Sequence, residues 1–182
     1  MFDPEALHAA VLDATRQAVQ DILSQHPDEK FYGFCLFTTT EATDLWLTAN
    51  THEALAKSAK GEPGRWEFWE WTYKEHLASK PLVSAALEQL YELIDAAPEE
   101  DDEAYDKLYT DGVAGAFDAY VQTMTDLDVE GAFAIAGTRE GIVLALTTND
   151  NSLKQQREWL GLLNTDVVAD RVVKEIKRNW SV

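Results

Sequence analysis

Cysteine is nearly absent from this sequence. Cys35 is the only one in 182 residues, so the chain cannot form an internal disulfide. Its position in a predicted strand favours a buried structural role as a small apolar group. Long apolar runs are also absent, since none approaches the roughly 20 residues of a membrane-spanning helix. Residues 1–5 lack the basic start and the apolar segment of a secretory signal. We therefore expect a soluble cytoplasmic protein.

Basic residues are scarce as well. Fifteen lysines and arginines stand against 33 aspartates and glutamates, which gives a net charge of -18. This charge repels phosphate backbones and anionic membrane surfaces, so it argues against nucleic acid and membrane partners and favours a basic protein partner. The 46% hydrophobic content is enough for a substantial core, and we expect residues 1–182 to form a single domain.

Recognisable catalytic and metal-binding motifs are missing. The four histidines are dispersed, and none belongs to a zinc-binding pair on adjacent helical turns: His8, His26, His52 and His76. The sequence contains no nucleophile elbow, no phosphate-binding glycine loop and no paired-cysteine motif. We therefore assign no catalytic residue, no metal ligand and no cofactor, and the sequence favours a non-catalytic role over an enzyme.

An internal repeat is the most informative pattern that is present. Residues 32–50, moved forward by 99 positions, align without a gap with residues 131–149. Seven aligned pairs are identical, whereas average residue usage would give about one by chance. These pairs are Phe34/Phe133, Thr39/Thr138, Glu41/Glu140, Leu45/Leu144, Leu47/Leu146, Thr48/Thr147 and Asn50/Asn149. The repeat predicts two related supersecondary units in one fold.

Each unit is predicted to have the order helix, strand, strand, helix. Apolar residues recur at helical spacing in the helices, and β-branched and aromatic residues dominate the strands. The predicted elements of the first unit, residues 3–60, are a helix from Asp3 to about Ser24, strands Phe31–Thr38 and Thr43–Ala49, and a helix from Asn50 to Ala59. Those of the second unit, residues 102–163, are a helix led by the acidic stretch Glu99–Glu103, strands Gly131–Gly137 and Gly141–Thr148, and a helix capped by Asn149 and Asp150 that ends near Leu163. The insert 61–98 holds a Trp-rich segment and a helix from Pro81 to Ala96, and another helix is expected around Val168–Ile176.

These elements predict an α+β fold, in which two related hairpins form an antiparallel sheet flanked by helices. Side chains alternate along a strand, so one face of this sheet should carry the shared core. Its members are Phe34, Leu36, Leu45 and Leu47 with their counterparts Phe133, Ile135, Leu144 and Leu146. The opposite face pairs Cys35, Phe37 and Trp46 with the small residues Ala134, Ala136 and Ala145. That face forms either a sealed layer or an open apolar groove, and we favour the sealed layer.

The Trp-rich segment, Glu62–Glu75, is the densest candidate for a site. Its aromatic residues fit both a strand and a helix, so periodicity leaves its form open. Tryptophan and tyrosine close cores and also concentrate at binding surfaces. Core closure is the favoured interpretation, followed by partner contact and by a small-ligand cage. The candidate binding residues are Trp46, Arg65, Trp66, Trp69, Trp71 and Tyr73.

Several short motifs resemble the bacterial family called domain of unknown function 4303. They occur in order over nearly the whole chain: Phe31-Tyr32-Gly33-Phe34, Asn50-Thr51, Arg65-Trp66, Glu70-Trp71 with Tyr73, Leu127-Asp128-Val129-Glu130-Gly131-Ala132-Phe133, and Leu163-Asn164. Glu67-Phe68-Trp69-Glu70 stands where members often have a turn-like stretch between two tryptophans. The resemblance implies no catalytic residues. By analogy, its size and acidic character are similar to those of immunity proteins that neutralise bacterial toxins.

The sequence therefore suggests three hypotheses for the function. The leading hypothesis is a non-catalytic protein-binding module, such as an immunity-type inhibitor of a basic bacterial toxin, whose negative field speeds encounter with its partner. The second is a small-ligand binder or an enzyme, with a pocket at the seam of the two hairpin units near Trp46 and residues 66–73. The third is a structural protein that forms a homodimer through the aromatic segment.

Overall fold

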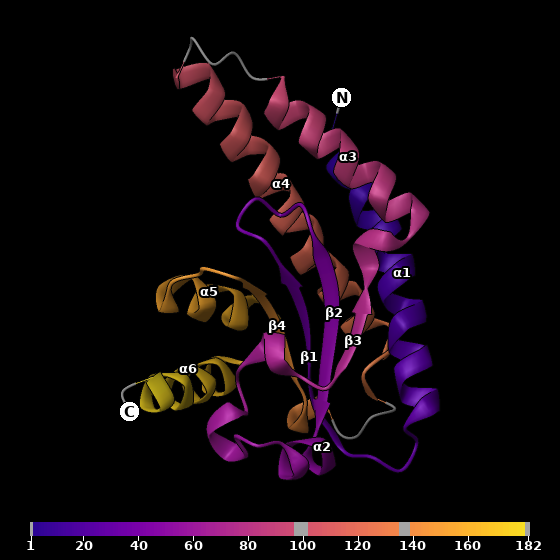
Figure 1. The fold of residues 1–182 in the computed structure, drawn as a ribbon, viewed down its shortest axis with the longest axis vertical. Coiled ribbons are helices and arrows are strands. Elements are labelled where there is room, and N and C mark those ends of the chain that lie inside the picture. The colour runs from indigo at the N-terminus through magenta and orange to yellow at the C-terminus, as the bar shows by residue number, and fades with distance from the viewer. Residues whose placement is uncertain (1, 97–101, 135–138, 181–182) are drawn as a thin grey trace.

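The computed structural model describes residues 2–96, 102–134 and 139–180. Their helices and strands are α1 (Pro4–Gln25), β1 (Phe31–Thr38), β2 (Leu45–Thr51), α2 (His52–Lys57), β3 (Tyr73–His76), α3 (Pro81–Asp95), α4 (Asp102–Val129), β4 (Val143–Thr148), α5 (Leu153–Leu163) and α6 (Asp166–Trp180), as Figure 1 shows. The predicted α+β class is confirmed. Of the predicted acidic stretch Glu99–Glu103, residues 99–101 lie outside the described residues.

Local sequence signals place α1 and β1 as predicted. Asp3 Oδ1 accepts hydrogen bonds from the backbone N–H of Glu5 at 3.0 Å and of Ala6 at 3.3 Å, which satisfies donors that the first helical turn leaves free. Pro4, the first residue of the helix, has no backbone N–H and therefore needs no hydrogen-bond acceptor. β1 has the predicted bounds, whereas β2 begins two residues later than predicted.

The sheet is mixed rather than antiparallel, which corrects the prediction. Its strand order is β3-β2-β1-β4. The β1–β2 and β2–β3 pairs are antiparallel, but β4 runs parallel to β1, so that Leu36 lies between Leu47 on one side and Leu146 on the other. A parallel neighbour requires a long connection, and the chain segment from β2 to β4 provides it through α3 and α4.

The predicted second hairpin is wrong in its described part. Residues 131–134 form turns instead of a strand, and residues 135–138, which include Ile135 and Ala136, lie outside the described residues. Gly131 has φ of +77°, and its N–H and that of Ala132 bond to the carbonyls of Asp128 and Leu127. This is a Schellman ending of α4. Phe133 therefore packs its ring 5.1 Å from that of Phe34 instead of extending a strand.

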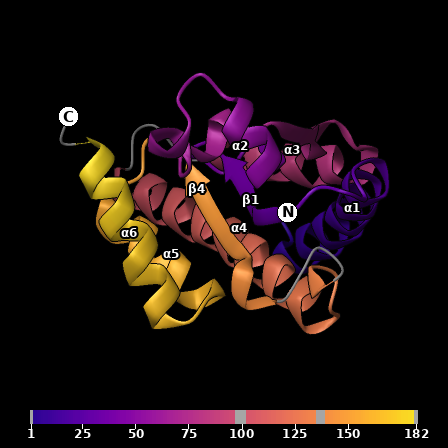
Figure 2. The same cartoon turned by 90° about the horizontal axis from the view of Figure 1, so that it is seen from below.

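The predicted core face of the sheet is confirmed for the described residues. Phe34, Leu36, Leu45, Leu47, Phe133, Leu144 and Leu146 are all fully buried. They form one cluster with apolar residues of α1, α3 and α4, and these helices cover that face (Figures 1 and 2).

The opposite face carries a second core, built by the Trp-rich segment and α6. Trp66, Phe68 and Trp71 pack there with Cys35 and Ala145, both of which are fully buried. Burial raises the pKa of the Cys35 thiol well above its usual value, consistent with the predicted structural role. The face is therefore sealed over this part, while Phe37 and Trp46 remain half-buried.

The start of α5 also differs from the prediction. Ser152 caps the helix by accepting a hydrogen bond from the Gln155 N–H, so α5 begins at Leu153 rather than at Asn149 and Asp150. The Asn149 side chain instead accepts a hydrogen bond from the Thr40 N–H, which ties the chain after β4 to the loop after β1.

Candidate functional site

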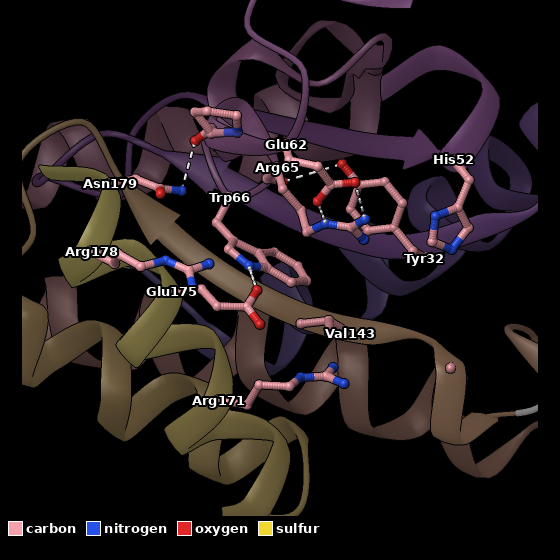
Figure 3. Close-up of a pocket in the computed structure, with 12 residues that line it drawn as sticks. Tyr32, His52, Glu62, Arg65, Trp66, Val143, Arg171, Glu175, Arg178 and Asn179 are labelled. Carbon is pink, nitrogen blue, oxygen red and sulfur yellow. Dashed lines mark hydrogen bonds and ion pairs between the residues drawn. The ribbon is translucent and has the colours of Figure 1, made fainter. Parts of the chain in front are cut away.

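A hollow of about 650 Å³ lies where the Trp-rich segment meets α6. Its lining comes from β1, β4, α2, α6 and the segment before β3 (Figure 3): Tyr32, His52, Glu62, Pro63, Arg65, Trp66, Gly141, Val143, Arg171, Glu175, Arg178 and Asn179. Residues far apart in the sequence thus meet in one pocket.

An aromatic cluster forms the base of the pocket. The Tyr32 ring meets the rings of Trp66 and Trp71 edge to face, with centroids 5.7 and 5.6 Å apart. Trp71 is only 1% exposed and lies directly over Gly33, where a Cβ atom would approach the indole to 2.5 Å. Gly33 therefore lets the indole reach the sheet, and the cluster provides a rigid wall.

Hydrogen bonds to the backbone fix this wall in place. The Arg65 carbonyl accepts one from Trp71 Nε1 at 2.8 Å and one from the Tyr32 hydroxyl at 3.2 Å. Asn50 Nδ2 donates to the same hydroxyl at 2.9 Å. Burial raises the pKa of Tyr32 to about 12, so its hydroxyl stays protonated at neutral pH and acts as a structural link.

Arg65 provides the first positive charge. Its Nε and Nη2 bind the two carboxylate oxygens of Glu62 at 2.8 and 2.7 Å. This pairing raises the pKa of Arg65 and lowers that of Glu62. The guanidinium also lies 4.8 Å from the centre of the Tyr32 ring, which is cation–π geometry. Arg65 is thus held over the aromatic wall.

α6 provides two further arginines on one face. Arg171, Glu175 and Arg178 are spaced by four and three residues, so they share a side of the helix. Glu175 Oε2 accepts a 2.6 Å hydrogen bond from Trp66 Nε1, which attaches α6 to the Trp-rich segment. The side chains of Arg171 and Arg178 have neither an ion pair nor a hydrogen bond with another described residue. Arg171 extends from the helix below Val143, and Arg178 extends beside Glu175 and Trp66 (Figure 3).

The charge of the pocket is opposite to that of the chain. Three arginines and two glutamates line it, whereas the chain as a whole carries -18. Two of those guanidiniums keep their donors free among the described residues. Guanidinium groups bind carboxylate and phosphate oxygens in a two-pronged geometry, so the arrangement suits an anionic ligand.

Part of the predicted site is brought together here. Arg65 and Trp66 line the pocket, and Trp71 supports Trp66 and Tyr32 from beneath. Trp69 is 40% exposed and lines a neighbouring hollow of about 210 Å³, which Trp66 also borders. The burial of Trp66, Phe68 and Trp71 agrees with the core closure favoured for this segment.

Two of the predicted residues lie elsewhere. Trp46 stacks on His76 with ring centroids 4.2 Å apart, and its Nε1 donates to Asp44. Tyr73 is on β3, and its hydroxyl donates to Glu29 Oε2 at 2.6 Å. Neither residue lines the pocket that contains Arg65, Arg171 and Arg178, which we call the Arg-lined pocket.

The sequence did not reveal Tyr32, Arg171 or Arg178 as members of a site. The spacing of Arg171, Glu175 and Arg178 opposite the apolar face of α6 was the available signal. This spacing indicates that the three side chains share a polar face of the helix. It does not indicate which part of the chain packs against that face, because Glu175 and its partner Trp66 are 109 positions apart.

The described residues show neither a metal-binding cluster nor a membrane-spanning helix. Within ranges 2–96, 102–134 and 139–180, no group of three or more histidine, cysteine, aspartate or glutamate residues could hold a metal ion. None of the helices in these ranges has the length and apolar character needed to cross a membrane.

Comparison with known proteins identifies a family. Neither the curated proteins nor the solved structures include a match to this chain. One family model matches residues 11–165, which include Tyr32, His52, Arg65 and Trp66, while α6 follows the matched part. Because the match covers most of the sequence, the chain belongs to the family described as Domain of unknown function (DUF4303).

Proposed function

We propose that this protein binds a small anionic ligand, of the phosphate or carboxylate class, in the pocket between the Trp-rich segment and α6. The carrying observation is the pair Arg171 and Arg178, which have no partner among the described residues and face the same hollow as Arg65. This proposal develops the small-ligand alternative, with the pocket beside Trp66 and remote from Trp46.

The two unpaired arginines support a bound anion. Exposed arginines in a chain of charge -18 would readily pair with the abundant carboxylates, yet Arg171 and Arg178 pair with none in the described part of the chain. A hydrogen bond to a charged group contributes about 1.5–3 kcal/mol, so one bond from each arginine contributes about 3–6 kcal/mol, which corresponds to a dissociation constant between tens of micromolar and several millimolar. The neighbouring aromatic wall lowers the local dielectric and strengthens this attraction.

The test is calorimetric titration of the chain at low ionic strength with three probes: inorganic phosphate, pyrophosphate and citrate. At least one is expected to bind saturably at one site per chain, with affinity that falls as salt is added. In the double variant Arg171→Gln/Arg178→Gln, the dissociation constant should rise at least about tenfold for that probe.

A matched control separates the pocket from general charge effects. Lys107→Gln/Lys154→Gln removes two exposed cations, from α4 and α5, that do not line the pocket, so it should leave the dissociation constant within about twofold. The proposal is wrong if no probe binds, or if the two double variants behave alike.

We also propose, as a second candidate, the protein-binding module inferred from the sequence, an immunity-type inhibitor of a basic bacterial toxin. The net charge of -18 favours it, because such a field attracts basic proteins. Capture from cell extract at low and high salt would identify the partner. Its association rate should fall by roughly 10- to 1,000-fold with rising salt, and a rate that ignores salt would contradict this mechanism.

A further inference from the structure

A second surface feature lies far from the Arg-lined pocket, along the junction of α1 and α3. These helices run side by side on the outer face of the molecule (Figures 1 and 2). Two hollows of about 390 and 250 Å³ follow the junction and adjoin at Ala10, Asp13 and Leu82, which line both. We call the two together the α1–α3 groove.

The walls of this groove are small and apolar. Ala6, Ala9 and Ala10 of α1 face Ala85 and Ala86 of α3 across the first hollow. Leu82 stands at the shared rim with 72% of its surface exposed. From Ala6 to Asp21 the groove follows sixteen residues of α1, whose fifteen steps of 1.5 Å span about 22 Å. It is long enough to hold four helical turns.

The rim of the groove is acidic. Asp13, Asp21 and Glu75 line it, against one lining cation, Lys80. Lys80 is already bound to Glu75 at 2.5 Å. Asp13 pairs with Arg16, but the Asp21 carboxylate accepts only an uncharged hydrogen bond, from Gln17, among the described residues. The rim therefore keeps negative charge beside an apolar floor.

We infer that the α1–α3 groove binds an amphipathic, basic helix of a partner protein. Apolar side chains at every third or fourth position would lie on the alanine floor and against Leu82, and flanking lysines or arginines would meet Asp13 and Asp21. A helix fits better than a strand, because backbone groups inside α1 and α3 are paired within each helix and offer no sheet edge. A second copy of this chain fits poorly, since two chains of charge -18 repel each other.

This inference assigns a surface to the second proposed function, the binding of a basic protein. It depends on that function only for the positive charge of the partner. The probe is a synthetic helical peptide of leucine and lysine, with leucine at helical spacing on one face and a fluorescent label. A scrambled peptide of the same composition is the control, because it has the same charge without the apolar face. The amphipathic peptide should bind at least about tenfold more tightly in anisotropy titrations, a difference of about 1.4 kcal/mol.

Two neighbouring substitutions test the place of binding. Ala85→Arg fills the groove and adds a repelling charge, whereas Ser84→Arg makes the same charge change on an exposed residue of α3 outside the lining. Ala85→Arg should weaken peptide binding about tenfold or more, and Ser84→Arg about twofold or less. Circular dichroism and urea unfolding would establish that both variants fold.

Each contrary result has a clear meaning. Equal binding of both peptides, or equal effects of Ala85→Arg and Ser84→Arg, would overturn the inference. A dimer in sedimentation that Ala85→Arg dissolves and Ser84→Arg preserves would show that a second copy occupies the groove, which also contradicts it. Arg171→Gln/Arg178→Gln should leave peptide binding unchanged, so failure of the groove and failure of the anion pocket are distinguishable.

Discussion

Tyr32 shows how single residues create the site. A bulge between Phe31 and Gly33 turns its side chain toward the Trp-rich segment, where it meets Trp66 and Trp71. Its hydroxyl accepts from Asn50 and donates to the Arg65 carbonyl. One side chain thus joins β1, β2 and the pocket wall. Sequence patterns find Tyr32 as an aromatic strand residue, but the bulge that redirects it depends on pairing with β2.

The raised pKa of Tyr32 predicts a pH dependence of stability. The unfolded tyrosine releases its proton near pH 10, but the folded one does so near pH 12. The native state therefore binds more protons over this interval, so the contribution of Tyr32 to the free energy of unfolding should be constant below about pH 10 and fall as the pH rises toward 12.

Urea unfolding at stepped pH measures this dependence, with Tyr32→Phe as the comparison. The variant cannot ionise at this position, so its stability should fall less steeply between pH 10 and 12. Tyr73, whose pKa burial also raises to about 12, accounts for part of the remaining slope. Identical slopes in both proteins would show that Tyr32 is not protected in the folded state.

Individual elements were predictable where local chemistry decides them. Asp3 and Pro4 set the start of α1, and the aromatic and β-branched residues of β1 set its bounds. The predicted strand at 131–137 failed in its described part, because Gly131 stops α4 and Phe133 is used to pack on β1. The repeat reflects a shared spacing of apolar residues. The same spacing occurs in a strand at residues 31–38 and in turns at residues 131–134.

β4 is the edge strand of the sheet, and a tertiary contact pairs part of its outer edge. Asn164, just after α5, donates from Nδ2 to the Leu144 carbonyl at 2.6 Å, and its Oδ1 accepts from the Leu144 N–H at 3.0 Å. The side chain thus pairs both backbone groups of Leu144 as a neighbouring strand would. The motif Leu163-Asn164 was visible in the sequence, but this role required the position of β4.

Packing of the Trp-rich segment on β1 predicts a large effect of Gly33→Ala. The added Cβ would lie 2.5 Å from the Trp71 ring and 3.2 Å from the Val143 carbonyl, and both neighbours are held in place. Overpacking of this kind costs about 1–3 kcal/mol, so the urea midpoint should fall and the tryptophan spectrum should change.

Gly161→Ala is the matched control within α5. Its Cβ would meet the end of the Arg157 side chain, which can move, and alanine favours a helix over glycine by about 1 kcal/mol. This variant should be as stable as the parent or more so. If Gly33→Ala were as well tolerated as Gly161→Ala, Trp71 would not be locked against the sheet.

At the scale of the whole molecule, a mixed sheet separates two cores with different partners. One face packs on α1, α3 and α4, and the other on the Trp-rich segment and α6. The composition predicted the acidic surface, but not that three arginines would gather in one pocket. That gathering requires α6 to lie against Trp66, a contact that no local pattern encodes.

A crystal structure of this chain, grown with the probe that calorimetry shows to bind and at no less than about ten times its dissociation constant, would test the anion site directly. The anion is expected within hydrogen-bond distance of Arg171 and Arg178, beside Arg65 and the Trp66 ring. The proposed site would be contradicted by an anion bound only at another surface, or by a pocket without the anion in a crystal of a chain that shows one saturable site in calorimetry.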